Sequence, residues 1–338
     1  MNKEKRIRIM MLLAAVVLYI RAVSFCNYAK KDADLLHIVL ARGVDGVMAE
    51  SIFLQERELD DPVGFCFWGE SKNQLVSCAE TGAFTQVTNV LLSGNPGLMG
   101  AESLTWQTGC LIDEATAQTL FGTVQCKNQV LWRDGVSYQV LGTVSTLRPT
   151  MLAIAAAEDG NVLNRCVLSV PAEKGSVLGR QFLMRWGLQG SILDFFPIWA
   201  LTNDLLLLLP GIFLLAFAGT LRKDWRKLTF SGVFSGTQLR LLMKMVPAFL
   251  VATGAVWFLG SRLIIPQDMI PSRWSDFSFW GNWWEAQKEN LMQILFTPMG
   301  NGQLQMMRNM IKSMVNSTAA AMLALWKVRR RDDADITD

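Results

Sequence analysis

The chain has 338 residues, of which 51% are hydrophobic and 18% are charged, and its formal net charge is +3. Soluble domains average about 25% charged residues, so this composition favours a membrane protein that carries a soluble part. The basic residues gather in short clusters beside apolar runs, and the small net charge argues against nucleic acid as a partner.

The N-terminus carries a basic cluster followed by an apolar run over 9–20. A membrane-spanning helix needs about 20 residues, so this run is short, and it also fits a signal peptide. Arg21 stands where a cleavage site needs small neutral residues, and Arg8 and Arg21 can extend the buried segment by reaching toward the membrane surfaces. We therefore predict a retained first span, with a cleaved signal peptide as the alternative.

Three further apolar runs follow at 205–221, 245–261 and 313–326, the last of which is the weakest. Lys and Arg gather before the first run, between the second and third, and after the fourth, which places these segments in the cytoplasm. We predict a polytopic α-helical membrane protein with four spans and an α+β extracytoplasmic domain between the first two, both termini being cytoplasmic. The predicted parts are 1–26 (cytoplasmic tail and first span), 27–193 (extracytoplasmic α+β domain), 194–221 (second span), 222–244 (cytoplasmic coupling loop), 245–265 (third span), 266–303 (extracytoplasmic Trp-rich loop) and 304–338 (fourth span and basic cytoplasmic tail).

Within 27–193 the early part is predicted from apolar patterning and turn residues. Residues 31–54 are predicted to form a helix, a glycine-marked turn and then a strand. Residues 63–79 are predicted to form a hairpin that turns at 70–73. These elements indicate a folded α+β domain.

The later part carries stronger local signals. Asp113 suits the N-cap of a short helix, and Gly122 suits its left-handed C-terminal position. Asp134 and Gly135 join two strand-like arms and favour a tight type I′ turn. A strand over 165–171 and a helix over 175–188 complete the predicted domain.

The order of these motifs resembles the extracytoplasmic core domain of the MacB/FtsX-like family of ABC transporter permeases. The resemblance covers 91–144 and rests on a glycine at a strand end, a helix ending in Leu-Phe-Gly, and a hairpin arm of the pattern Tyr-x-Val-x-Gly-x-Val. The earlier "GVDGV" at 43–47 resembles the family's Gly-Val turn. The matching residues are Gly94, Leu120, Phe121, Gly122, Tyr138, Val140, Gly142 and Val144.

The resemblance implies a permease-like subunit of an ABC-type export or mechanotransmission system in the bacterial plasma membrane. It implies a separate cytoplasmic ABC ATPase and a homodimer, or a heterodimer with another permease. No GxxxxGK[ST] motif occurs, so this chain carries no P-loop of its own. The domain is small for the family and the Trp-rich loop is long, which argues against a periplasmic-adaptor role.

Two segments are candidate interaction sites. The family's equivalent cytoplasmic loop docks on the ATPase, and here that loop has a basic cluster around one Trp, for which a membrane anchor is the alternative. The Trp-rich loop fits a helix on the outer leaflet or an entry surface for an amphipathic peptide or lipid. The loop residues are Arg222, Lys223, Trp225, Arg226 and Lys227; the outer aromatic residues are Trp274, Trp280, Trp283 and Trp284.

No catalytic, metal-binding or cofactor-binding cluster is predicted. The chain has one histidine, His37, expected on a helix face or in the core, and six cysteines without a CxxC pair. An extracytoplasmic location would permit disulfides, and the alternative is separate buried thiols. The chief alternative function is an envelope sensor or an activator of a partner protein without transport; a membrane-anchored enzyme is disfavoured by the single histidine.

Overall fold

The computed structural model describes residues 3–104, 106–155, 162–171, 175–225, 236–265, 270, 271, 273 and 278–336. Its contacts divide the chain into two compact units. The helical unit comprises Met1–Ala29, Pro197–Pro266 and Arg308–Asp338, and the α+β unit comprises Lys30–Phe196 and Gln267–Met307.

The α+β unit is built on a nine-stranded sheet among the described residues, in the order β3-β7-β4-β6-β5-β2-β8-β1-β9. Most neighbouring strands are antiparallel, whereas β3–β7 and β4–β6 are parallel. The strands are β1 (Leu35–Val44), β2 (Gly64–Ser77), β3 (Phe84–Gly94), β4 (Gly109–Asp113), β5 (Val130–Arg133), β6 (Val136–Val144), β7 (Thr150–Ile154), β8 (Leu163–Ser169) and β9 (Gly190–Leu193).

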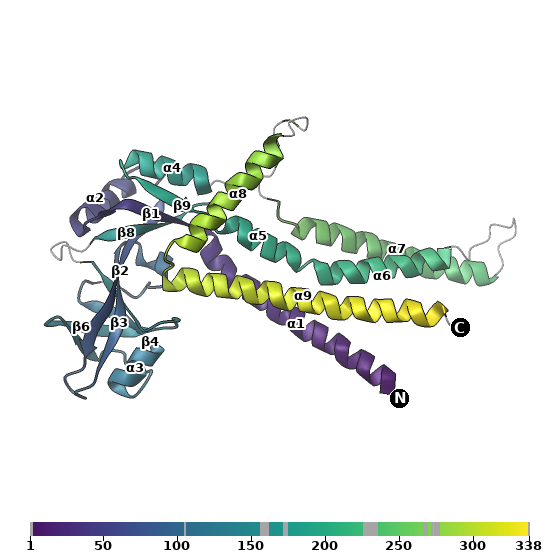
Figure 1. Cartoon of the computed structure of the whole chain (residues 1–338), viewed down its shortest axis with the longest axis horizontal. Helices are drawn as coiled ribbons and strands as arrows, with labels where there is room; N and C mark the ends of the chain where they lie inside the picture. The colour runs from purple at the N-terminus through teal and green to yellow at the C-terminus, as the bar shows by residue number, and fades with distance from the viewer. Residues whose placement is uncertain are drawn as a thin grey trace. The chain divides into compact units, whose positions relative to one another are not determined.

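Helices α2 (Gly46–Arg57), α3 (Glu114–Phe121) and α4 (Gly175–Arg185) cover one face of this sheet. Their apolar residues join one core cluster with Phe65 and Phe67 of β2. Because side chains alternate along a strand, the intervening Cys66 and Trp68 enter a second cluster on the other face, together with the segment around the 3-10 helix η1 (Pro96–Met99). Figure 1 shows α2 and α4 lying close to each other and α3 beside β4.

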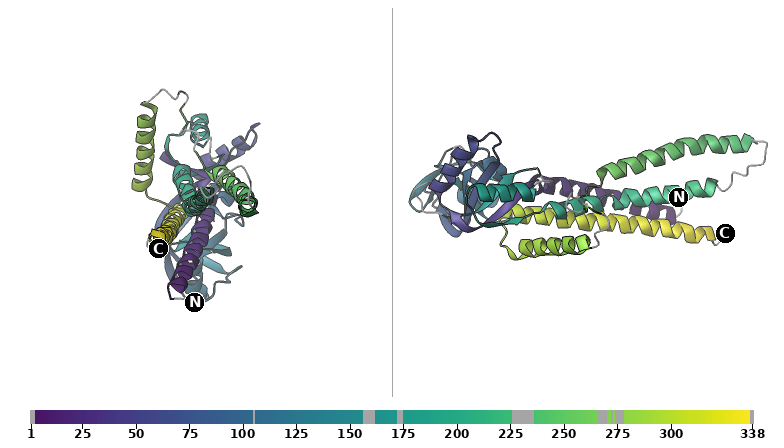
Figure 2. Two further views of the ribbon diagram at one scale, coloured as in Figure 1. Left: turned by 90° about the vertical axis from the view of Figure 1, so that its right-hand side faces the viewer. Right: turned by 90° about the horizontal axis from the view of Figure 1, so that it is seen from above.

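The helical unit contains all of α6 (Leu208–Trp225) and α7 (Gly236–Arg262) and most of three other helices. These are α1 (Lys3–Ala33), α5 (Phe196–Leu205) and α9 (Asn301–Ile336). Ala15 of α1, Leu209 of α6 and Ala320 of α9 share a buried cluster, and the views of Figure 2 show these three helices running together. The small alanine side chains allow close approach of helices, a feature common in membrane-protein interiors.

Two helices in the described part of the chain are long and apolar enough to cross a membrane. They are Ile9–Ala33 and Phe196–Gly219; Val246–Arg262 is a shorter apolar helix. The predicted third and fourth spans fall on α7 and α9, and their crossing stays a prediction.

Two local predictions were wrong. Residues 35–44 form strand β1 and 46–57 form helix α2, the reverse of the predicted order. Asp45 is the reason for the helix start, because its side chain accepts a hydrogen bond from the Met48 N–H at 2.7 Å. Residues 64–77 form one long strand instead of a hairpin: Asn73 has a φ of 58°, and the register with β3 shifts between Ser71 and Gln74, which marks a bulge.

Other local predictions are confirmed. Asp113 caps α3 by accepting from the Thr116 N–H at 3.0 Å, and Gly122 has a φ of 70°. Asp134 and Gly135 both have positive φ, as a type I′ turn requires. The Trp-rich segment contains a helix, α8 (Ser278–Phe296), as one of its two interpretations expected, and its location at the outer leaflet stays a prediction.

Candidate functional site

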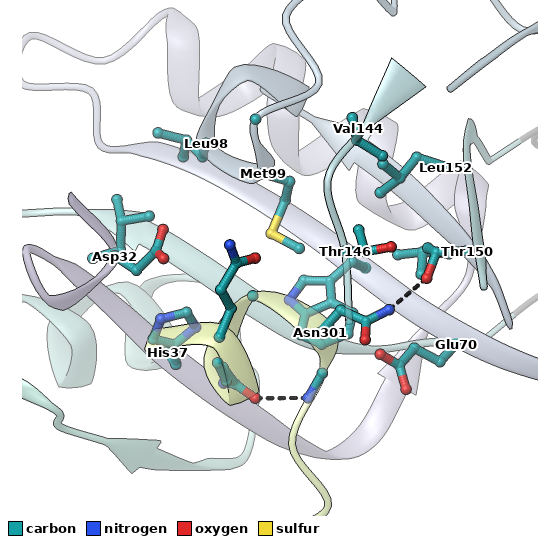
Figure 3. A pocket seen from close by; sticks show the side chains of 18 of the residues that line it. Asp32, His37, Glu70, Leu98, Met99, Val144, Thr146, Thr150, Leu152 and Asn301 are labelled. Carbon is teal, nitrogen blue, oxygen red and sulfur yellow. Dashed lines mark hydrogen bonds between the residues drawn. The ribbon is translucent and has the colours of Figure 1, made fainter. Parts of the chain in front are cut away.

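A cavity of about 310 Å³ lies in the α+β unit, on the sheet face opposite α2, α3 and α4. It lies between β1, β2 and β7, the segment around η1, the turn after β6 and the first turn of α9 (Figure 3). Small-ligand sites typically measure roughly 300–1,000 Å³, so the cavity is large enough for a small molecule. Its lining residues are Asp32, Leu35, His37, Trp68, Glu70, Val90, Leu98, Met99, Gly100, Val144, Ser145, Thr146, Thr150, Leu152, Gly300, Asn301, Gly302, Gln303 and Gln305.

Strand alternation places the polar side chains of this cavity. His37 follows Leu35 by two residues on β1, and Glu70 follows Trp68 by two residues on β2, so each pair shares a face. The neighbouring Leu36 and Ile38 enter the core under the helices. The same periodicity that builds the core therefore directs an imidazole, an indole and a carboxyl into the cavity.

The first turn of α9 forms the remaining wall. A side chain at Gly300 would meet the Trp68 ring, because an added Cβ would lie 2.4 Å from Trp68 Cη2 and 3.0 Å from Glu70 Oε1. The Gly300 N–H donates to Gln303 Oε1 at 3.1 Å. Glycine is thus the residue that lets the chain pass closely over the indole.

Arg165 of β8 ties this turn to the sheet. Its guanidinium donates to the Pro298 carbonyl and, at 3.4 Å, to Gln303 Oε1. The same guanidinium lies 4.7 Å from the centre of the Trp68 ring, within the range of a cation–π interaction. Arg165 is only 8% exposed, so these contacts hold a buried charge.

A second tie joins Asn301 to the sheet. The Asn301 side-chain amide donates to the Thr150 hydroxyl at the start of β7. The Thr150 backbone N–H donates to Asp113 Oδ1 at 2.7 Å, and Asp113 also caps α3. One connected set of hydrogen bonds therefore runs from α9 through β7 to α3.

Two polar atoms around the cavity are buried and have no hydrogen-bond partner in the described part of the chain. They are the indole N–H of Trp68 and the side-chain oxygen of Asn301. Burial lowers the pKa of His37 to about 4; a hydrogen bond with the Asp32 backbone opposes this shift, and the positive charge of Arg165 adds to it. His37 is thus a neutral imidazole at pH 7, with one nitrogen that donates and one that accepts.

The lining of the cavity combines two carboxyl groups, amides and hydroxyls with apolar walls, a composition suited to binding a small molecule. The described residues contain no group of three or more His, Cys, Asp and Glu placed to hold a metal ion. All six cysteines are buried as free thiols, and burial raises the pKa of the Cys66 and Cys110 thiols to about 12. Such thiols are poor nucleophiles, because the thiolate is the reactive form.

No protein-family model and no curated protein matches the chain. About half of the chain is similar in structure to the periplasmic region of MacB from Actinobacillus actinomycetemcomitans, with 8% identity over 47% of this chain and 86% of that one and a TM-score of 0.37.

Two further structures are similar. The extracellular domain of the noncanonic ABC-type transporter YknZ from Gram-positive bacteria has 15% identity over 46% of this chain and 99% of that one, with a TM-score of 0.35. A domain of a protein described as a permease from Porphyromonas gingivalis has 12% identity over 48% of this chain and 92% of that one, with a TM-score of 0.35.

The predicted cytoplasmic coupling residues lie at the end of α6 and beyond it. Arg222 is on α6 and exposed, and Lys223 and Trp225 belong to the same helix. Arg226 and Lys227 lie outside the described residues. Their predicted contact with an ATPase stays a prediction.

The predicted outer aromatic residues lie mainly on α8. Trp280 is 39% exposed and Trp284 is 64% exposed, whereas Trp283 is half-buried. Trp274 lies outside the described residues. The segment that carries the three described indoles is held to the α+β unit, because Asn290 donates to the Asp194 carbonyl at 2.8 Å.

Sequence reasoning missed the cavity and its α9 wall. Asn301 and Gln303 are polar residues in an unremarkable run before an apolar helix, and their partners Thr150 and Arg165 are more than a hundred positions away. The one available signal was His37, a lone histidine in an apolar segment. It is buried as expected, but on a strand.

Proposed function

We propose that the chain is a permease-like subunit of an ABC-type export or mechanotransmission system in the bacterial plasma membrane. In this proposal a separate cytoplasmic ATPase binds and hydrolyses ATP, and the extracytoplasmic α+β domain responds. The resemblance of 91–144 to the MacB/FtsX-like permeases supports this function, as do the apolar helices α1 and α5–α6 that precede and follow the main part of the domain.

The observation that carries the proposal is the anchoring of α9. This helix is continuous from Asn301 to Ile336, and its first turn is bonded to the sheet through Asn301 and Gln303. A packed sheet moves as a unit and does not deform continuously, so a shift of α9 along its axis would be passed to β7 and β8. Such a shift would give the chain a physical route for mechanical transmission.

The proposed topology has four spans, with α7 and α9 as the third and fourth and both termini in the cytoplasm. Trp280 and Trp284 would then lie at the outer leaflet, since indoles favour the headgroup region of a bilayer. The basic cluster of 222–227 would face the cytoplasm, where exposed Arg and Trp residues suit a protein interface. A dimer of two such subunits, identical or different, would complete the system.

The test is an affinity pull-down of the detergent-solubilised chain from its own cells under nucleotide-supplemented conditions. One variant replaces Arg222, Lys223, Arg226 and Lys227 with Ala. A matched control replaces Arg329, Arg330 and Arg331, in the basic cluster near the C-terminus, with Ala. Recovery of an ABC-type ATPase with wild type and control, but not with the first variant, would support the function and its coupling loop.

Two other results would change the proposal in different ways. If no ATPase comes down with the wild-type chain, the permease function is wrong, and the envelope sensor or activator becomes the better interpretation. If both variants recover the ATPase, the ATPase remains the partner, but the 222–227 cluster is not its docking site.

A further inference from the structure

The cavity of the α+β unit contains polar groups that lack partners, and they lie together. Trp68 is 2% exposed, and its indole N–H has no hydrogen-bond partner among the described residues. Burying a polar atom without a partner costs stability, and Trp68 lines the same cavity as Asn301, whose side-chain oxygen is also unpaired. A bound molecule that supplies partners would offset that cost.

The orientation of the Asn301 amide follows from its neighbour. The Thr150 hydroxyl donates its proton to the Arg148 carbonyl at 2.7 Å, so toward Asn301 it can only accept. The NH₂ group of Asn301 must therefore face Thr150, and its carbonyl oxygen is left for the cavity. This oxygen is a fixed hydrogen-bond acceptor.

A carboxyl group lines the same cavity. Glu70 Oε1 would be 3.0 Å from a Cβ placed on Gly300, the residue before Asn301, and Figure 3 labels Glu70 and Asn301 among the residues around the cavity. Both the carboxyl and the free Asn301 oxygen are acceptors, so a ligand that meets them must supply donors. A positively charged donor fits best, because one of the two oxygens carries a formal charge.

The rest of the lining gives the charge and shape of the ligand. Asp32 adds a second carboxyl, His37 is neutral, and no Lys or Arg is among the residues that line the cavity in the described chain. The guanidinium of Arg165 contacts Trp68, Pro298 and Gln303, and its charge also interacts with that of Glu70. Opposite the polar groups the wall is apolar, formed by Leu35, Leu98, Met99, Val144 and Leu152.

We propose that this cavity binds a small organic amine, with its ammonium group between Glu70 and Asn301 and its apolar body against Leu98, Met99 and Val144. A bare metal ion would leave the apolar wall empty, and an anion would meet two carboxylates. The site needs no ATPase and no movement of α9, so it is independent of the proposed coupling function.

The test measures binding to the detergent-solubilised full chain by isothermal titration calorimetry. The probes are butylamine, 2-phenylethylamine and tryptamine, and 2-phenylethanol serves as the uncharged counterpart of the second. We expect saturable binding of at least one amine, and binding of 2-phenylethanol weaker than that of 2-phenylethylamine by about tenfold, the effect of losing one charge-assisted hydrogen bond.

Variants locate the site. Glu70→Gln should weaken amine binding by about tenfold, whereas Glu80→Gln, which removes an exposed carboxyl outside the cavity, should leave it unchanged. Ser145→Phe fills the cavity from an exposed position and should abolish binding without removing a charge. Circular dichroism and thermal unfolding check that each variant is folded. If the Glu70→Gln variant does not fold, binding to the Ser145→Phe variant alone decides whether the amine binds in this cavity.

Two outcomes would overturn the proposal. In the first, none of the amines binds to the wild-type chain. In the second, 2-phenylethanol binds as well as 2-phenylethylamine, or the binding survives both Glu70→Gln and Ser145→Phe.

Discussion

The Arg165 guanidinium lies 4.7 Å from the centre of the Trp68 ring and also donates to the Pro298 carbonyl. One buried cation thus holds the indole that lines the cavity and the backbone that leads into α9. Because Arg165 belongs to β8, an interior strand paired with β2 on one side and β1 on the other, the start of α9 is attached to a strand that is hydrogen-bonded on both edges.

Replacing Arg165 with Ala should loosen this attachment. The variant loses a charge-assisted hydrogen bond and a cation–π contact, so we expect the free energy of unfolding to fall by about 3 kcal/mol. Hydrogen exchange should accelerate in 298–305 more than in α3 or β4. The control is Arg42→Ala, which removes an exposed arginine from β1; unchanged protection of 298–305 in the Arg165 variant would contradict the anchoring role.

His37 should make the domain sensitive to acid. Its pKa is about 4 in the folded chain and about 6.5 in an unfolded one, so the unfolded chain binds the proton more readily. The contribution to stability is present above pH 6.5 and is lost as the pH falls toward 4, and it amounts to about 3 kcal/mol at most.

The measurement compares thermal unfolding of wild type and His37→Phe from pH 7.5 to 4. Phenylalanine preserves an aromatic ring against Phe195, whose centroid lies 5.3 Å from that of His37, and it cannot be protonated. We expect a shallower loss of stability between pH 6.5 and 4 in the variant. Parallel curves for the two proteins would show that His37 is not buried and neutral as described.

The parts of the fold that were predicted correctly are those determined by interactions between residues close in the sequence. Asp113 and Gly122 mark the two ends of α3 through hydrogen bonds to residues a few positions away, and the turn at Asp134 and Gly135 needs only positive φ. The run at 35–40 is almost entirely apolar, so it lacks a period that separates a buried strand from a buried helix. Recognising Asp45 as an N-cap would have placed α2 correctly.

The cavity was beyond such reasoning, because its walls come together only through tertiary contacts. Trp68 and Gly300 are far apart in the chain, and nothing near Gly300 in the sequence indicates that an indole lies against it. The Arg165–Pro298 contact likewise joins residues 133 positions apart. Local propensity carries no information about pairs of this kind.

Glu56 should be the most sensitive charged residue outside the cavity. Its carboxylate is buried, and it accepts hydrogen bonds from Arg185 and from the Trp186 indole, both at 2.7 Å, and from the Val63 N–H at 3.0 Å. Glu56→Ala leaves the indole and the backbone N–H without this acceptor, and we expect a loss of about 3 kcal/mol in the free energy of unfolding.

Arg185→Ala is the matched comparison. The Arg185 side chain is 39% exposed and that of Glu56 is 1% exposed, and the carboxylate keeps two of its donors in this variant. We therefore expect a smaller loss, about 1 kcal/mol, measured by urea unfolding. Equal losses for the two variants would mean that the ion pair, and not the set of hydrogen bonds around Glu56, holds α2 against α4.

Gly94 should tolerate no side chain, for a reason that separates it from other glycines of the domain. Its φ is +107°, and an added Cβ would lie 2.7 Å from the Phe65 carbonyl oxygen. That oxygen is held in place because it accepts the Asn95 N–H at 2.8 Å. Gly94→Ala therefore combines an unfavourable φ with a backbone clash, and we expect a loss of about 3 kcal/mol.

Gly82→Ala isolates the clash. Gly82 also has a positive φ, +68°, but an added Cβ would meet nothing within 4 Å, so only the conformational cost of about 1 kcal/mol applies. Urea unfolding of the two variants should therefore differ by about 2 kcal/mol, the part due to contact with Phe65. If the two losses are equal, the strand end at Gly94 has room to move, and a glycine is required there for its φ alone.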